Sequence, residues 1–238
     1  MTDLSDYLAK WKHNIGGPYP ECIASADYLL ADCVNNLDRN QHLTSARLFQ
    51  TGFGSWRASV TMSLAGAASQ VPATLRHALE CTLYAFVCAR DTNFEETWWK
   101  REVDESAKKS MRGRTGPLAR AKVILASENF QLRDSASFLL DTLIDFGAHP
   151  NVMLFTENTE IKENGENVSY ITTLLGSNEA RDGSHLISSS VAIEMLKIYR
   201  EIWPMRFDTQ KERAFAEVIG QSKLFMNFHH SKNYEAES

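Results

Sequence analysis

The stretch ATLRHALECTLYAFVCAR, residues 73–90, decides the fold class. Its leucines, together with Phe86 and Val87, recur at helical spacing along one side, while alanines and cysteines cover another side. A helix that is apolar nearly all round is normally enclosed by other elements. The stretch therefore predicts a helix at the centre of a helical bundle.

Segments with the same helical period lie on both sides of this helix in the sequence. We expect them at residues 21–34, 43–69, 92–99, 117–127, 131–148, 186–203 and 209–228. Thr92 and Thr209 each stand three residues before a glutamate, which predicts a capping box at the start of two of them. The sequence thus predicts an all-α, multi-helix bundle of about seven or eight helices, with residues 1–238 forming a single helical domain.

Three glycines interrupt the predicted helix over residues 43–69. Gly52, Gly54 and Gly66 each cost a helix about 1 kcal/mol relative to alanine. We expect another helix to approach these small positions closely and to compensate for that cost.

The chain changes character after Pro150. VMLFTENTEI and VSYITTLL are rich in β-forming residues, and Asn164-Gly165 between them is typical of a two-residue turn. We expect a β-hairpin insertion within residues 151–176, with strands over about 152–175 and with Ile161 facing Val168. A lone hairpin is marginally stable, so it should lie on the helical body. Ser177–Ser184 is expected to be a loop, and the polar residues 231–238 a disordered tail.

The composition limits the classes of protein to which the chain can belong. With 43% hydrophobic and 23% charged residues, it is an ordinary globular sequence rather than a disordered one. The net charge of −5 argues against nucleic acid or an anionic membrane as a general partner. No signal peptide and no apolar run of membrane-spanning length is present. These features predict a cytoplasmic protein without a membrane partner.

The four cysteines are Cys22, Cys33, Cys81 and Cys88. Separations of 11 and 7 residues return each pair to one helix face, where the two thiols are too far apart for a disulfide. No CxxC motif occurs. We therefore expect core cysteines, no metal site and no cofactor.

A polar ladder lies on the otherwise apolar helix 73–90. Arg76, Glu80 and Tyr84 follow one another at intervals of four residues, with His77 beside them. Arg76 and Glu80 can pair along the helix. The ladder is either an ion pair that holds helices in register, or part of a pocket for a small ligand or substrate.

An acidic face is predicted on the helix that ends before Pro150. Asp141, Asp145 and His149 recur every four residues, and Asn151 follows the break. Two carboxylates and an imidazole suit acid–base chemistry or a divalent cation, although such a face can equally be a solvated surface. The sharpest catalytic hypothesis brings Arg76, Glu80, Asp145 and His149 together across two helices, with Asn151 as a further ligand-binding candidate.

A basic connector precedes the helix at residues 117–127. Its candidates for binding an anion or nucleic acid are Lys108, Lys109, Arg112 and Arg114. Free N–H groups at a helix start favour anions. A solvated, charged loop is the alternative, because the aromatic residues that stack on single strands are absent from it.

Two pieces of the chain, LRHALECTLYAFVCARD (75–91) and DTLIDFGAHPN (141–151), resemble a pattern in uncharacterised bacterial helical proteins. In these an Arg-x-x-x-Glu helix precedes a helix ending in a His-Pro step. Some resemble the HEPN (higher eukaryotes and prokaryotes nucleotide-binding) helical bundles of toxins and phage-defence systems. The resemblance implies a bundle, often dimeric, with Arg76, Glu80 and His149 at matching positions. The Arg-x4–6-His motif of HEPN ribonucleases does not occur in this sequence.

No motif in the sequence identifies its function. The leading hypothesis is a non-catalytic binding or regulatory protein, a homodimer that uses either the Trp98/Trp99 region or the hairpin as its contact surface. Burial of both indoles in the core is the alternative for the tryptophans. An enzyme using the polar pocket, with a small ligand or a metal, and a HEPN-like RNA-binding or RNA-cleaving protein remain the other two hypotheses.

Overall fold

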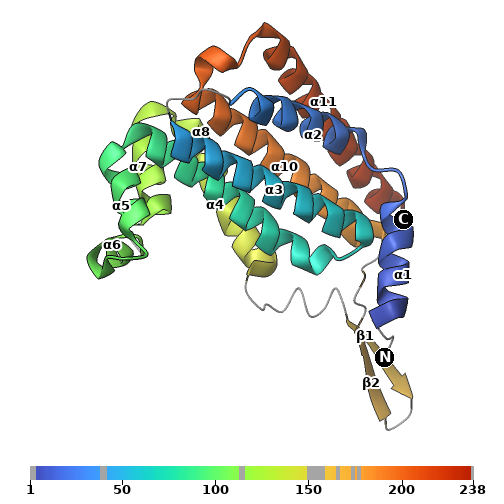
Figure 1. The fold of residues 1–238 in the computed structure, drawn as a ribbon. Coiled ribbons are helices and arrows are strands. Elements are labelled where there is room, and N and C mark those ends of the chain that lie inside the picture. Colours follow the sequence, from blue (N-terminus) through green and yellow to red (C-terminus); the bar gives the residue numbers. More distant parts are fainter. Residues whose placement is uncertain are drawn as a thin grey trace.

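The computed structural model describes residues 4–37, 42–112, 116–148, 159–164, 167–172, 175 and 178–236. Its helices form a bundle in which α4 (Val71–Arg90) packs against helices on several sides (Figure 1). The apolar side chains of α4 are buried, among them Leu75, Leu79 and Phe86 at 0% exposure. The prediction of a central helix over residues 73–90 is confirmed.

α3 (Leu43–Ala65) is the most extensive neighbour of α4, and the short η1 (Ala68–Gln70) joins the two. The helices approach most closely at Gly52, where an added Cβ would lie 2.8 Å from the carbonyl oxygen of Ala78. The expectation of close approach holds for this glycine only. Gly54 has no atom within 4 Å of its Cβ position, and Gly66 ends α3 in a left-handed conformation at φ 89°.

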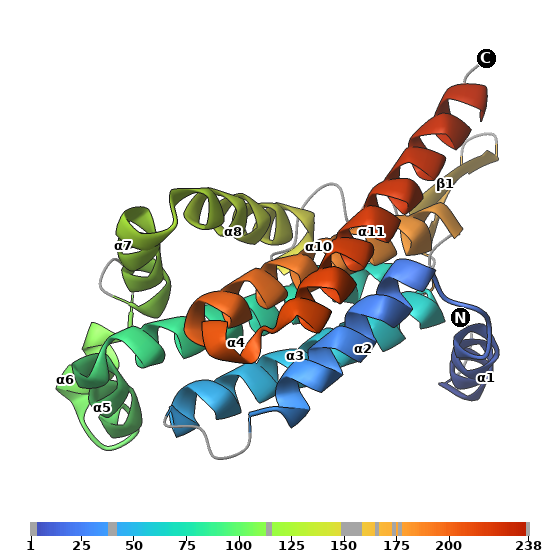
Figure 2. The same ribbon diagram turned by 90° about the horizontal axis from the view of Figure 1, so that it is seen from above.

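α10 (Asn178–Ile202) is a second central helix. It packs against α4 and α3, and also against α2 (Glu21–Asn35), α8 (Phe130–Leu143) and α11 (Thr209–Ala236). Figure 2 shows α2 and α11 beside α10, with α7 and α8 on a different side of the bundle. One connected set of buried apolar side chains draws on all these helices.

Two long-range hydrogen bonds tie α10 to the N-terminal half of the chain. The indole nitrogen of Trp56 on α3 donates to the carbonyl oxygen of Ser188 at 2.8 Å, and the Tyr199 hydroxyl donates to the carbonyl oxygen of Cys33 at 3.2 Å. Both bonds are buried. They satisfy polar atoms that would otherwise be left unpaired in an apolar interior.

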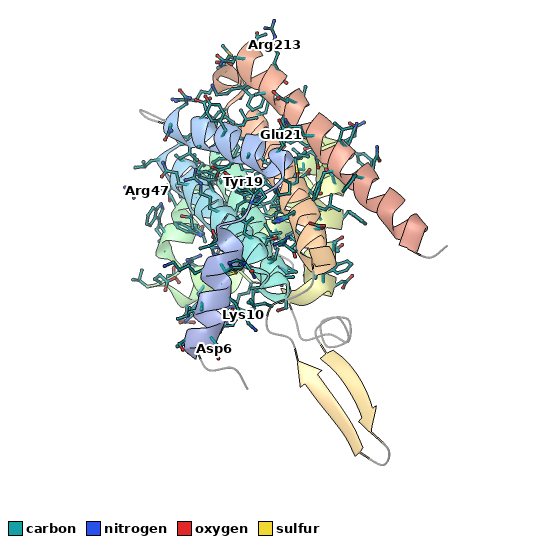
Figure 3. The ribbon with its side chains drawn as sticks, turned by 90° about the vertical axis from the view of Figure 1, so that its right-hand side faces the viewer. Asp6, Lys10, Tyr19, Glu21, Arg47 and Arg213 are labelled. Carbon is teal, nitrogen blue, oxygen red and sulfur yellow. The ribbon has the colours of Figure 1, made fainter. Side chains whose placement is uncertain are left out.

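The remaining helices lie around this centre. Their bounds are α1 (Leu4–Ile15), α5 (Thr92–Lys100), α6 (Glu105–Ser110) and α7 (Pro117–Glu128), with η3 (Ile144–Ala148) after α8 and η4 (Pro204–Arg206) before α11. α1 buries no residue and is tied to α3 by a 2.8 Å hydrogen bond from the Asn14 amide to the carbonyl oxygen of Ala65. Figure 3 shows Asp6 and Lys10 on α1, and Arg213 near the start of α11 at the other end of the view.

The described residues form ten α-helices, more than the seven or eight expected. One addition is α6, which begins at Glu105 and runs into the predicted connector, and the Asp104 side chain caps it by accepting from the N–H groups of Ser106 and Ala107. The predicted loop Ser177–Ser184 is also wrong, because α10 already begins at Asn178. α11 continues to Ala236 and so includes most of the predicted disordered tail 231–238.

The expected capping boxes are wrong by one residue. The side chain of Asp91, not Thr92, accepts the N–H of Phe94 at the start of α5. The Asp208 carboxylate likewise accepts the N–H of Lys211 at 2.9 Å at the start of α11. An aspartate one position earlier makes the bond that was assigned to each threonine.

The hairpin region contains two antiparallel strands, β1 (Thr159–Asn164) and β2 (Asn167–Thr172). They cover only part of the expected 152–175, of which residues 152–158, 165, 166, 173 and 174 lie outside the described part of the chain. The predicted register is wrong, because Ile161 pairs with Tyr170 rather than with Val168. In Figure 1 the strands extend away from the helices instead of lying on them.

Candidate functional site

The polar ladder of α4 contains an ion pair within one helix. Arg76 Nε lies 2.8 Å from Glu80 Oε1, as their spacing predicts. The two side chains are 29% and 23% exposed, so water reaches both charges. The pair is therefore less desolvated than its position on a central helix suggested.

His77 bridges α3 and α4. Its Nδ1 lies 2.8 Å from the hydroxyl oxygen of Ser55 on α3, and its Nε2 lies 3.6 Å from the sulfur of Cys81 one turn along α4. A histidine can act as a general base for a neighbouring hydroxyl or thiol, which is the usual arrangement of an activated nucleophile. Whether Cys81 can serve as the nucleophile depends on whether its thiol is deprotonated.

Burial keeps the Cys81 thiol and the Tyr84 hydroxyl protonated. Desolvation, with a contribution from the charge of Glu80, raises the pKa of the Cys81 thiol to about 11. Desolvation first, and then the charge of Glu80, also raise the pKa of Tyr84. Since the thiolate is the nucleophilic form of cysteine, Cys81 is a poor nucleophile at neutral pH.

The other cysteines are free and buried, as expected. Desolvation raises the pKa of Cys33 to about 12 and that of Cys88 to about 12. Burial also raises the pKa of Cys22. These thiols therefore pack as small apolar side chains.

The elements that carry the two candidate groups are in contact, since η3, which carries Asp145, packs against α4, which carries the ladder. Gly147 in η3 has φ 151°, so the helix predicted to Ala148 departs from α-geometry before its end. His149 and Asn151 lie outside the described residues, and the four-residue site stays a prediction. Within the described ranges, no three His, Cys, Asp or Glu side chains are grouped to hold a metal ion.

The basic candidates lie on α6 and just after it. Lys108, Lys109 and Arg112 are exposed, and Lys108 Nζ lies 3.2 Å from Glu105 Oε1; Arg114 lies outside the described residues. Gly116 and Pro117 at the start of α7 are buried. Leu118 and Ala119, the next two residues of the helix start, are half-buried, and Arg120 is exposed.

A hollow of about 550 Å³ lies between the end of α4, the start of α5 and α7. Its two arginines both have carboxylate partners: Arg120 Nη2 lies 2.7 Å from Asp91 Oδ2, and Arg90 Nε lies 3.0 Å from Glu128 Oε2. The positive charges are thereby balanced inside the hollow. It offers no excess charge to an anionic ligand.

Two buried polar groups were missed by the sequence analysis. The Glu194 side chain on α10 is 4% exposed, accepts from the Ser135 hydroxyl at 2.5 Å and lies 3.0 Å from Lys197 Nζ. His185 Nδ1 lies 2.9 Å from the Ser63 hydroxyl, and both residues are buried at 2% and 0%. A substrate cannot reach either group. The sequence signal that could have predicted the buried glutamate is Glu194 itself, a single acid between Ile193 and Met195 in an apolar run, with Lys197 three residues later.

Three exposed apolar residues lie on α5, just after it and at the start of α3, and we call Leu43, Trp99 and Val103 the Trp99 patch. Their exposures are 57%, 54% and 89%. The Trp99 indole nitrogen donates to the Thr44 hydroxyl at 3.0 Å, which fixes the ring beside the start of α3. Trp98 is half-buried and packs edge-on against Trp99, with the two ring centroids 5.0 Å apart. Joint burial of the two indoles is therefore not found.

None of the helices in the described part of the chain combines the length and the apolar character that a membrane crossing needs. Comparison with protein-family models, with curated proteins and with solved structures gives no match to this chain.

Proposed function

We propose that the chain is a non-catalytic binding protein that forms a homodimer through the Trp99 patch. The observation that carries the proposal is the exposure of Leu43, Trp99 and Val103 together, with Trp99 held in place by its hydrogen bond to Thr44. Tryptophan is enriched among the residues that contribute most to interface stability. A fixed ring also loses little conformational freedom on binding.

A second copy of the chain suits the patch because its charges have both signs. Lys100 Nζ lies 3.7 Å from Glu96 Oε2, and Arg101 Nε lies 3.1 Å from Glu102 Oε1, all on or just after α5. A twofold interface brings the same surface of two subunits together. An apolar centre with a rim of mixed charge can pair with itself, whereas a rim of one sign would repel its copy.

The state of the candidate catalytic groups supports a non-catalytic role. The Cys81 thiol is protonated at neutral pH, and Arg76 and Glu80 neutralise each other in partial contact with water. The buried Ser63–His185 pair has no route to a substrate. Two alternatives remain: an enzyme that uses the ladder with Asp145 and His149, and a HEPN-like RNA-binding or RNA-cleaving protein.

Native mass spectrometry of the full chain tests the proposal. The wild type should give a mass at twice 26.9 kDa, and Val103→Asp should shift it to the monomer because two buried carboxylates would face each other across the twofold axis. Leu224→Asp, on an exposed position of α11, is the matched control and should remain dimeric. A monomeric wild type, or a dimer that survives Val103→Asp, would overturn the dimer.

A further inference from the structure

The outer face of α8 carries aromatic rings and carboxylates in one stripe. Phe130, Asp134, Phe138 and Asp141 fall within an arc of about 80° on a helix of 3.6 residues per turn. The two rings are 58% and 73% exposed, and both aspartates are exposed. We call these four residues the α8 stripe. In Figure 2, α8 lies at the edge of the bundle.

The opposite face of α8 packs against the rest of the bundle. Its buried residues are Leu132, Ala136, Leu139, Leu140 and Leu143. The exposed rings are therefore not needed to attach α8 to the bundle. Large aromatic side chains on a face that is otherwise free for polar residues are typical of a binding surface.

The charges of the stripe select the kind of partner. Asp134 is matched by Arg133, whose Nη2 lies 2.6 Å from Oδ1 and whose guanidinium lies 4.1 Å from the centre of the Phe130 ring. No lysine or arginine occurs from residue 134 to residue 143, the end of α8, where the exposed Asp141 adds an acid. The half of the stripe around Phe138 is thus apolar and negatively charged.

We propose that the α8 stripe binds a basic, amphipathic helical segment of another protein. Apolar side chains of such a segment would cover Phe138 and Phe130, and its lysines or arginines would meet Asp141. The net charge of −5 favours approach of a basic partner. A second copy of the chain fits poorly, because a twofold contact would place carboxylates against carboxylates.

This inference rests on the proposed role as a binding protein, but not on the Trp99 patch. The probe is a labelled 18-residue peptide of leucine and lysine, with leucines at i, i+3, i+4 and i+7 spacing, titrated with the full-length protein in fluorescence anisotropy. Two control peptides carry glutamate in place of lysine, or serine in place of leucine. The leucine–lysine peptide should bind at least about tenfold more tightly than either, a difference of about 1.4 kcal/mol.

Variants of the stripe locate the binding. Phe138→Ser should weaken binding of the leucine–lysine peptide at least about tenfold, as expected for a central aromatic anchor. Asp141→Asn should weaken it less and make it less sensitive to salt. Leu224→Asp on α11 should leave binding unchanged. Circular dichroism melting should show every variant folded, because all three positions are exposed.

Three results would overturn the inference: no binding of the leucine–lysine peptide, equal binding of a control peptide, or unchanged binding by Phe138→Ser. The oligomeric state, measured on the same samples, separates this failure from that of the proposed dimer. If the protein is dimeric but does not bind the peptide, only the inference of an α8 partner is contradicted. If the protein is monomeric and binds the peptide, only the proposed dimer is contradicted.

Discussion

Lys197 and Arg76 each pair with a glutamate on their own helix, and burial makes the two pairs differ in energy. Glu194, the partner of Lys197, is 4% exposed, whereas Glu80, the partner of Arg76, is 23% exposed. A buried carboxylate that loses its cation keeps the full cost of its desolvation. A partly exposed one is re-solvated by water, and its ion pair contributes little to stability.

Replacement of each cation by an apolar residue of similar length therefore separates the two pairs. Lys197→Met should lower the free energy of unfolding by about 3 kcal/mol, and Arg76→Met by less than about 1 kcal/mol. Urea unfolding at neutral pH measures both. The double variant Lys197→Met/Glu194→Gln should recover most of the larger loss, since no buried charge remains. Equal losses in the two single variants would contradict the assignment.

A second effect at the residue scale concerns Asp208 and pH. The N–H of Lys211 donates to the carboxylate and, together with the charge of Lys211, lowers the pKa of Asp208 below its ordinary value of 3.8. A carboxyl group whose pKa is lower in the folded state stabilises the fold above its unfolded pKa. That contribution is lost as the pH falls through the folded value.

Asp208→Asn removes this titration but keeps a side chain that can cap α11. The wild type should therefore be the more stable protein at pH 7, and the difference should shrink as the pH falls below about 4. Urea unfolding of both proteins from pH 7 to pH 2 follows the change. A difference that stays constant over this range would show that the lowered pKa does not contribute to stability.

At the scale of the element, the glycines of α3 have different roles that sequence spacing does not reveal. Gly52 admits the backbone of α4, Gly54 faces open space, and Gly66 supplies a positive φ at the helix end. The sequence does not distinguish the three glycines, because it does not show whether each one faces another helix, faces solvent or ends the helix.

Alanine at the first two positions distinguishes them. Gly52→Ala places a Cβ 2.8 Å from a carbonyl oxygen and 3.0 Å from the Thr82 hydroxyl, so it should destabilise the fold by about 1–3 kcal/mol despite better helix propensity. Gly54→Ala meets nothing within 4 Å and should stabilise it by up to about 1 kcal/mol. Thermal unfolding measures the pair. Shifts of the same sign would contradict the close approach of α3 and α4.

Elements with a long apolar period were predictable, and those specified by single polar residues were not. α4 was found because its apolar residues extend around most of the helix. The first turns of α10 were not predicted, since Gly183 and Ser184 resemble a loop in the sequence. The caps of α5 and α11 were misplaced because Asp91 and Asp208 stand directly before threonines that fit the same motif.

At the scale of the whole molecule, the candidate site was predicted only as far as one helix can specify it. The Arg76–Glu80 contact follows from a spacing of four residues, and the structure has it at 2.8 Å. The Ser55–His77 contact joins residues 22 positions apart on two helices, and the Glu194–Ser135 contact joins residues 59 apart. Such contacts depend on how the helices are placed, which no local pattern encodes.

The position of α10 also has a consequence for synthesis on the ribosome. This helix occupies the centre of the bundle, yet it comes from residues 178–202 of a chain of 238. The partners of Trp56 and Cys33 lie 132 and 166 residues further along the chain. Helices α2, α3 and α4 therefore emerge with part of their apolar surface uncovered, and it stays so until residues 178–202 have been translated.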